Sequence, residues 1–141
     1  MKTFDGFQRG MGIGGWLTNF KRPHTLPEQW RNVLSPGDFE HFDSYISETD
    51  VRRLAAFGMD HVRLAFDQIV LEEKPGVWRR HIFNLLDTFI GWCQAARLNV
   101  VLNLHKAIGN NCELKENASL MEDAVLQARF IGLWQAVEQH Y

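Results

Sequence analysis

The sequence predicts an α/β fold built on a parallel β-sheet. Three short apolar segments typical of strands alternate with three segments whose apolar residues recur every three or four positions, as on one face of a helix. Parallel strands need such helical crossovers, whereas antiparallel strands can be joined by tight turns. The 141 residues are enough for one domain with a core and too few for two.

The first strand is expected within residues 8–15, in the glycine-rich stretch GMGIGGWL. Gly10, Gly12 and Gly15 match the G-x-G-x-x-G spacing of a dinucleotide-binding turn. That turn needs an apolar strand before it and a helix starting within it, but TFDGFQR upstream is polar and LTNFKRPHTLP downstream contains two prolines. We therefore interpret these glycines as sites of close backbone packing, or as space for a large side chain from a neighbour.

A long connection of mixed polarity is expected over residues 18–45, with a short helical turn near residues 28–34. A helix then begins after Ser47, because Asp50 three residues later completes a capping-box pattern. Gly58 is expected to end this helix, since glycine readily adopts the conformation that follows a helix.

The remaining elements follow from apolar periodicity. DHVRLAF and NVVLNLH are expected to be the second and third strands, with a helix of clear 3.6-residue period between them over residues 78–98. A last helix is expected over residues 121–141. Its predicted apolar face consists of Ala124, Ala128, Ile131 and Trp134. Three strands would leave two unpaired edges, so the sequence is expected to be the front part of a larger sheet.

Composition excludes several classes of protein. A hydrophobic content of 45% and a net charge of −2 indicate an ordinary globular chain and give no electrostatic reason to expect a nucleic-acid partner. Neither a signal-peptide core nor a membrane span is visible, which predicts a soluble protein, cytoplasmic or of undetermined location. Cys93 and Cys112 have neither disulfide-framework nor zinc spacing, and the histidines form no H-E-x-x-H motif, so no metal or cofactor is expected.

Polar residues near two strand ends are the candidates for chemistry, because ligands of parallel α/β folds bind at the carboxyl ends of strands. Arg63 lies in a strand expected to be buried, and it is either a structural ion-pair partner or a residue that orients a catalytic carboxylate. Asp67 follows as a rim residue or helix cap. His105 and Asn103 lie near the end of the third strand, where a lone histidine is often structural. Together these residues predict a shared pocket, bordered by the turn-prone residues 109–111.

The segments RGMGIGGWL, HFDSYISETDVRRLAAFGMDHVRLAFDQIVLEE and LNVVLNLHKAIGN together resemble the opening of glycoside hydrolase family 5. Within that family the chain is most similar to bacterial endo-β-1,4-glucanases (cellulases). The resemblance implies a (β/α)8 TIM barrel, of which residues 1–141 would be the N-terminal part of a single catalytic domain, with about three βα units, stopping before the fourth strand. It also implies hydrolysis of β-glycosidic bonds with retention, using two glutamates.

The resemblance assigns roles to particular residues. Arg63 would hydrogen-bond the nucleophile, and His105 would line the sugar subsite next to the cleaved bond. The residues expected to bind substrate are Trp16, Asn19, Phe20, Asn103 and Lys106. Both catalytic glutamates would lie beyond Tyr141, since Glu138 falls within a helix, so the fragment alone is expected to be inactive.

Departures from the family pattern leave the substrate open. Ala65 replaces the usual Pro, Asn103 the usual Asp and Lys106 the second His, and residues 11–13 differ from the common x-N-L. The alternatives are a mannanase or β-1,3-glucanase of the same fold, or a non-catalytic remnant that binds sugar or a partner. The expected partners are a β-linked polysaccharide or oligosaccharide, and a second copy bound through exposed strand edges, with no nucleic acid and no membrane.

Overall fold

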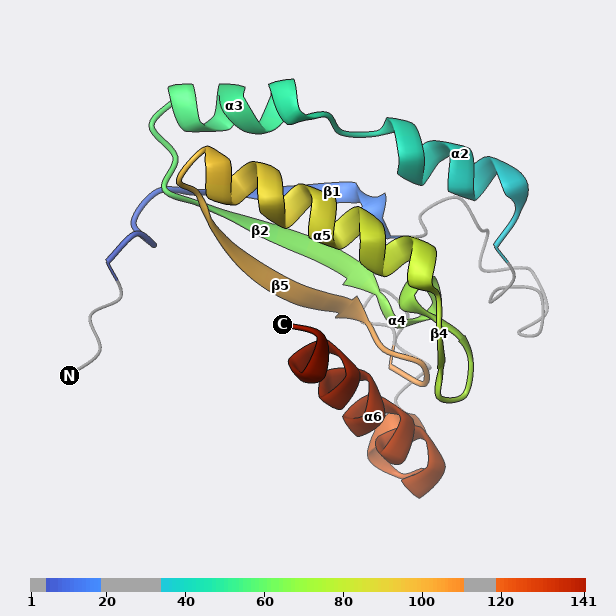
Figure 1. Cartoon of the computed structure of the whole chain (residues 1–141). Coiled ribbons are helices and arrows are strands. Elements are labelled where there is room, and N and C mark those ends of the chain that lie inside the picture. The colour runs from blue at the N-terminus through green and yellow to red at the C-terminus, as the bar shows by residue number, and fades with distance from the viewer. Residues whose placement is uncertain (1–4, 19–33, 111–118) are drawn as a thin grey trace.

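The computed structural model describes residues 5–18, 34–110 and 119–141. Its main feature is a three-stranded parallel sheet in the order β1–β2–β5. The strands are β1 (Gly10–Leu17), β2 (His61–Asp67) and β5 (Asn99–Lys106). Helices α3 (Glu48–Ala56) and α5 (Arg80–Ala95) lie on one side of the sheet, and α6 (Ala124–His140) lies near β5 (Figure 1). The predicted parallel α/β arrangement is confirmed for these strands.

Several short elements were not predicted. They are α2 (Pro36–Ser44), α4 (Gln68–Leu71), the hairpin of β3 (Glu72–Lys74) and β4 (Val77–Trp78), and a 3-10 turn over Ser119–Met121. Helix α2 lies in the segment expected to be a connection, and it begins at Pro36. At the first turn of a helix proline is favourable, and the backbone N–H of Ser35 donates to Asp38 Oδ2 at 2.7 Å. The turn expected near residues 28–34 lies almost entirely outside the described residues.

Helix α3 begins and ends as predicted. The backbone N–H and the hydroxyl of Ser47 donate to Asp50 Oδ2 at 3.0 and 2.7 Å. These hydrogen bonds from Ser47 lower the pKa of Asp50, because they stabilise its carboxylate form. Gly58 follows the helix with φ +77°, a conformation that costs glycine little.

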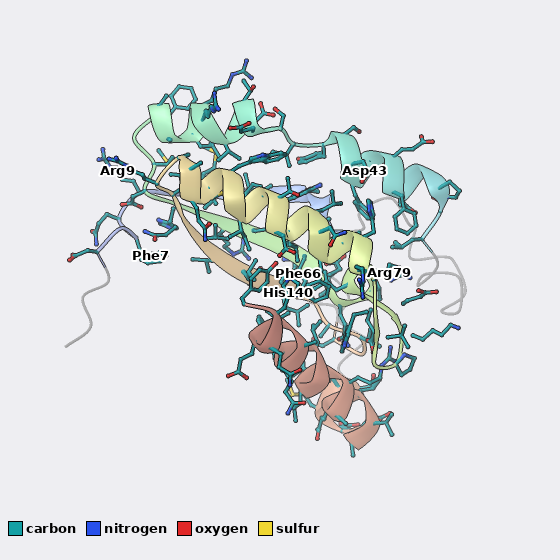
Figure 2. All side chains as sticks on the ribbon, in the orientation of Figure 1. Phe7, Arg9, Asp43, Phe66, Arg79 and His140 are labelled. Carbon is teal, nitrogen blue, oxygen red and sulfur yellow. The ribbon has the colours of Figure 1, made fainter. Side chains whose placement is uncertain are left out.

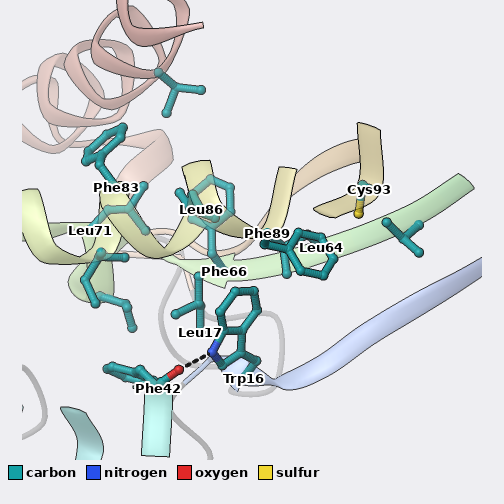
Figure 3. Close-up of a cluster of buried hydrophobic side chains, with 14 of the residues drawn as sticks. Trp16, Leu17, Phe42, Leu64, Phe66, Leu71, Phe83, Leu86, Phe89 and Cys93 are labelled. Carbon is teal, nitrogen blue, oxygen red and sulfur yellow. Dashed lines mark hydrogen bonds between the residues drawn. The ribbon is translucent and has the colours of Figure 1, made fainter. Parts of the chain in front are cut away.

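The core lies between the sheet and α5. Val62, Leu64 and Phe66 occupy alternate positions of β2 and are fully buried on the same side as the helices. The predicted apolar stripe of α5 meets them, and Figure 3 shows Leu86 and Phe89 within this cluster. Burial of each such side chain stabilises the fold by roughly 1.5–3 kcal/mol.

Trp16 is part of this core, which corrects the expectation that it faces a sugar. Its side chain is only 2% exposed, its Nε1–H donates to the Phe42 carbonyl at 2.7 Å, and its ring lies 5.3 Å from that of Phe89 (Figure 3). The cause is local. The pairing register of β1 shifts between Ile13 and Leu17, and Gly15 within this irregularity has φ +74°. A uniform strand would not place the indole at this position.

The sequence predicted that the glycines of β1 allow close packing, and the structure shows such packing at Gly10. Gly10 pairs with His61 of β2, and a Cβ atom at Gly10 would overlap the His61 imidazole. That ring is held in place, because His61 Nδ1 donates to Asp60 Oδ1 at 2.7 Å and the ring centroid lies 5.3 Å from that of Phe7. By contrast, nothing lies within 4 Å of a Cβ built at Gly14.

The orientation of α6 differs from the prediction. Ala124 and Ala128 are exposed and Ile131 is 55% exposed, whereas Leu133 and Val137 form the buried face. Only Trp134 of the predicted stripe is partly buried, with its ring 6.3 Å from that of Phe66. Tertiary contacts of α6, described below, therefore override the periodicity of its sequence.

We predict that Gly10→Ala lowers the free energy of unfolding by about 1–3 kcal/mol, because the new methyl group would have to displace the anchored His61 ring. Gly14→Ala is the matched control on the same strand, and its effect should stay within about 0.5 kcal/mol. Urea denaturation followed by circular dichroism measures both. Equal losses in the two variants would contradict the role assigned to Gly10.

Cys93 should be chemically inert in the folded chain. It is completely buried, and this burial raises the pKa of its thiol to about 11. At about pH 8 the native thiol should therefore contain roughly a hundredfold less thiolate than the same group after unfolding. We expect a Cys112→Ser variant to react with Ellman's reagent only in concentrated urea. Rapid labelling in buffer would contradict this placement of Cys93.

Candidate functional site

Arg63 and Asn103 meet on the face of the sheet that points away from α5. Arg63 Nη2 donates to Asn103 Oδ1 at 2.6 Å, which joins the adjacent strands β2 and β5. Arg63 is exposed rather than buried, because it alternates with Val62 and Leu64 and so points away from the core. Its partner here is a neutral amide rather than the carboxylate of a structural ion pair. The two residues thus lie together, but Arg63 is not part of the lining of the groove described below, so the structure joins only some of the residues predicted to share a pocket.

His105 lies two residues beyond Asn103 and is half-buried at the carboxyl end of β5. Both line a groove of about 580 Å³ that runs between β5 and α6. The following turn adds Asn110, and Gly109 with φ +77° allows this turn to approach Leu120 closely. On the opposite wall, Gln127 of α6 supplies a further amide.

Apolar side chains supply much of the groove's lining. They are Leu102, Leu104, Leu120, Phe130, Ile131 and Trp134. No carboxylate, lysine or arginine of the described chain lines it, so among the described residues the imidazole of His105 is the only lining side chain of a type used in general acid–base catalysis. The groove follows the outer edge of β5. No strand among the described residues pairs with this edge, since β2 lies on the other side of β5. The groove therefore suits an uncharged occupant, either an extended strand or an apolar ring face.

Lys106 and Asp67 form a second polar pair where β5 and β2 end. Lys106 Nζ lies 4.0 Å from Asp67 Oδ2, and their side chains are 13% and 2% exposed. Asp67 also occupies the N-cap position of α4, one of the two predicted alternatives, but its side chain makes no capping hydrogen bond to that helix. The ammonium group of Lys106 is thus turned largely toward the protein, which limits the surface that it offers to a substrate.

Sequence reasoning missed a buried cluster next to these strand ends. Glu72 at the start of β3 has no exposed side-chain surface, and Arg129 of α6 reaches both of its oxygens, with Nε 3.3 Å from Oε1 and Nη2 3.1 Å from Oε2. Gln68 Nε2 donates to Glu72 Oε2 at 2.8 Å, and Gln68 Oε1 accepts from the backbone N–H of Ile108 at 3.1 Å. The sequence signal was an arginine within an otherwise apolar helical stretch.

The amino ends of the strands have a different character. Asp60 Oδ2 accepts from the backbone N–H groups of Gln8 and Arg9, and the hydrogen bond from His61 is the main cause that lowers the pKa of Asp60. Figure 2 shows Phe7 and Arg9 at this end, far from Arg79 at the other. These polar groups satisfy one another, so we assign this end to stability rather than chemistry.

Some predicted residues lie outside the described part of the chain, namely Asn19, Phe20, Asn111 and Cys112. Glu138 lies within α6, as expected. The described residues include no cluster of three or more histidine, cysteine or acidic side chains able to hold a metal ion. Among them, no helix is both long and apolar enough to cross a membrane.

Comparison with known proteins decides the family. The model of the cellulase family, glycosyl hydrolase family 5, matches residues 23–141. The chain belongs to glycosyl hydrolase family 5. This match includes β2, β5 and the helices described above, so Arg63, Asn103 and His105 all lie within the family-5 region.

Relatives of this family-5 chain include several named enzymes. Endoglucanase C of Acetivibrio thermocellus is 31% identical over 137 residues, which are 96% of this chain and 36% of that protein. Cellodextrinase A of Ruminococcus flavefaciens is 26% identical with the same coverage. A probable glucan 1,3-beta-glucosidase A of Neosartorya fischeri is 30% identical over 129 residues, covering 77% of this chain and 30% of that protein.

A crystal structure of a glycoside hydrolase has the same fold in the corresponding region. It superposes with a TM-score of 0.63 at 20% identity, and the match covers 94% of this chain and 36% of that one. The family-5 chain therefore spans about a third of the length of endoglucanase C, of cellodextrinase A and of this glycoside hydrolase.

Proposed function

We propose that this chain forms the opening part of the active-site domain of a retaining β-glucan hydrolase with a (β/α)8 barrel. The observation that supports this most directly is the 2.6 Å hydrogen bond between Arg63 and Asn103 on adjacent parallel strands, at the surface away from the core. In folds with parallel sheets, catalytic groups gather toward the carboxyl ends of the strands. The family-5 match gives this arrangement its chemistry.

In this proposal Arg63 orients the nucleophilic glutamate and keeps its carboxyl group ionised. A guanidinium group has five N–H donors in a planar fork, and the known bond to Asn103 uses only one of its nitrogens. The other donors could bind a carboxylate, and the adjacent positive charge would hold the pKa of that carboxylate down. His105 would contact the sugar ring next to the cleaved bond.

Two glutamates would perform hydrolysis, one as acid/base and one as nucleophile, with their carboxyl groups about 5–5.5 Å apart. In the proposed enzyme both come from later strands of the barrel. The proposed substrate contacts still include Asn103 and Lys106. They also include Asn19 and Phe20, which lie outside the described residues. Trp16 is left out of this set, because its indole is buried against Phe89.

A β-1,4-glucan is the proposed substrate. The endoglucanase and cellodextrinase relatives align with 96% of this chain, whereas the probable glucan 1,3-beta-glucosidase aligns with 77%. A second role is favoured by the open groove beside β5. We propose that in the isolated chain a second copy covers this groove and the unpaired strand edge.

We predict that Arg63→Ala and His105→Ala each lower kcat on carboxymethylcellulose by about a hundredfold or more, in a protein that continues this chain to the length of its relatives. The reason is the loss of charge stabilisation at the nucleophile and of sugar contact. Release of reducing sugar measures activity, with mannan and laminarin as competing substrates. Arg52→Ala removes an exposed arginine of α3 and is the matched control.

The same variants separate catalysis from stability. Melting temperatures within a few degrees of wild type are expected, because Arg63 is exposed and its partner is neutral. A loss of melting temperature that accounts for the loss of activity would contradict the proposed roles. Hydrolysis by the 141-residue chain alone would contradict the assignment of both glutamates to later strands.

We predict that the 141-residue chain self-associates in sedimentation velocity experiments as its concentration rises. Ile131→Glu should weaken this association, since Ile131 lines the groove and is 55% exposed. Val77→Glu is the matched control, because Val77 is 47% exposed on the β3–β4 hairpin and does not line the groove. A monomer at every concentration, or equal effects of the two variants, would refute the interface.

A further inference from the structure

We propose that Gln68, Glu72 and Arg129 are positioning residues that hold the turn after β5, residues 107–110, and thereby fix His105 at the sugar-binding edge. The inference rests on the proposed function for its sugar-binding part alone. Below, these three residues are called the buried relay. None of them needs to touch the substrate, since each acts through the next.

The carboxylate of Glu72 is the centre of the buried relay. Its side chain has no exposed surface, so an unpaired charge there would be strongly unfavourable. Four donors meet it: the guanidinium of Arg129 at both oxygens, the Gln68 amide at 2.8 Å and the backbone N–H of Gly76 at 2.9 Å. This set neutralises the charge and leaves the carboxylate one orientation.

That orientation decides where Gln68 points. The Gln68 amide is 1% exposed and donates to Glu72, so its oxygen must face the other way. There it accepts from the backbone N–H of Ile108, 40 residues along the chain. Ile108 is the third residue after His105. A hydrogen bond between buried or half-buried groups therefore joins α4, the segment after β2, to the turn after β5.

The backbone that presents Glu72 and Gln68 is itself anchored. Arg79 Nη1 donates to the carbonyl of Ile69 at 2.7 Å and to that of Glu72 at 2.7 Å, and burial lowers the pKa of Arg79. The turn after β5, whose Ile108 N–H donates this bond, is held within the described part of the chain chiefly by the bonds from Asn110 N to Ala107 O and from Leu120 N to Gly109 O. The rigid partner is thus the segment after β2, and the positioned partner is the turn.

The buried relay also reaches the other wall of the groove. Arg129 lies on α6, next to Phe130, which lines the groove opposite His105 and Asn110. One carboxylate thereby links both walls, through Gln68 to the turn and through Arg129 to the helix. A purely local packing role would require neither connection, so the structure assigns the relay a role in the geometry of the site.

The first test replaces Gln68 with Met, which keeps the volume and removes both hydrogen bonds. We expect hydrogen exchange of the Ile108 amide to become about tenfold faster or more, which corresponds to the loss of one buried hydrogen bond. The imidazole NMR signals of His105 should shift, while the amides of β2 exchange within about twofold of wild type. Gln94→Met, on the exposed side of α5, is the matched control.

The second test acts at a distance. Arg129→Met should also speed exchange at Ile108, although Arg129 does not bond Ile108, because an unpaired Glu72 no longer fixes the Gln68 amide. Arg52→Met, at an exposed ion pair of α3, is the control. If Arg129→Met unfolds the chain, exchange at Ile108 is measured instead in Gln68→Met and in Arg129→Lys, which keeps the positive charge. Unchanged exchange at Ile108, or equal acceleration across the sheet, overturns the inference.

The third test separates this inference from the proposed function. Wild-type chain, kept at concentrations at which sedimentation velocity shows a monomer and titrated with cellotetraose, should show saturable shifts of the His105 signals, and Gln68→Met should weaken that binding about fivefold or more. Equal affinity in both would overturn the link between the buried relay and sugar binding. No shift in wild type would overturn the proposed function and that link together, while the exchange rates at Ile108 would still decide whether the relay holds the turn.

Discussion

The parallel pairing of β2 with both of its neighbours is the constraint on which the rest of the structure depends. Because β2 is the middle strand, its alternate side chains face two different environments. Leu64 points beneath α5 and is buried, while Arg63 points to the open face beside Asn103. A one-residue shift of register would exchange these sets and place a guanidinium in the apolar layer. The packing under α5 therefore also fixes the polar site.

The two ends of the sheet differ in how far along the chain their polar contacts extend. At the amino end, Asp60 accepts hydrogen bonds from the Gln8 and Arg9 backbones and from His61, so the polar groups are satisfied among neighbours. Near the carboxyl end, the contacts of Glu72 and Gln68 instead extend to elements 40 or more residues away. Long-range contacts of this kind can hold loops in one geometry, which a binding site requires.

Local patterns were enough to predict the three strands of the parallel sheet and α5, because apolar periodicity and capping act over a few residues. They failed for Trp16, whose burial depends on a register shift next to Gly15 that no alternation rule anticipates. They failed again for α6, where Arg129 bonds Glu72 across 57 positions and so fixes which face is buried. At the candidate site, sequence reasoning proposed Arg63, Asn103 and His105, and the structure joins Arg63 to Asn103 and places Asn103 and His105 in one groove. The Gln68–Glu72 contact was not foreseen, because it depends on an unpredicted helix and hairpin.

Lys106 and Arg63, on the adjacent strands β5 and β2, have different partners, and this difference supports the role proposed for Arg63. Lys106 lies beside the buried Asp67, so its charge is met within the chain. Arg63 instead donates to the neutral amide of Asn103. An aspartate would neutralise the guanidinium, whereas the amide oxygen fixes its position and leaves its charge unpaired by that contact. Of the two, Arg63 is therefore the cation able to act on a carboxylate from another segment.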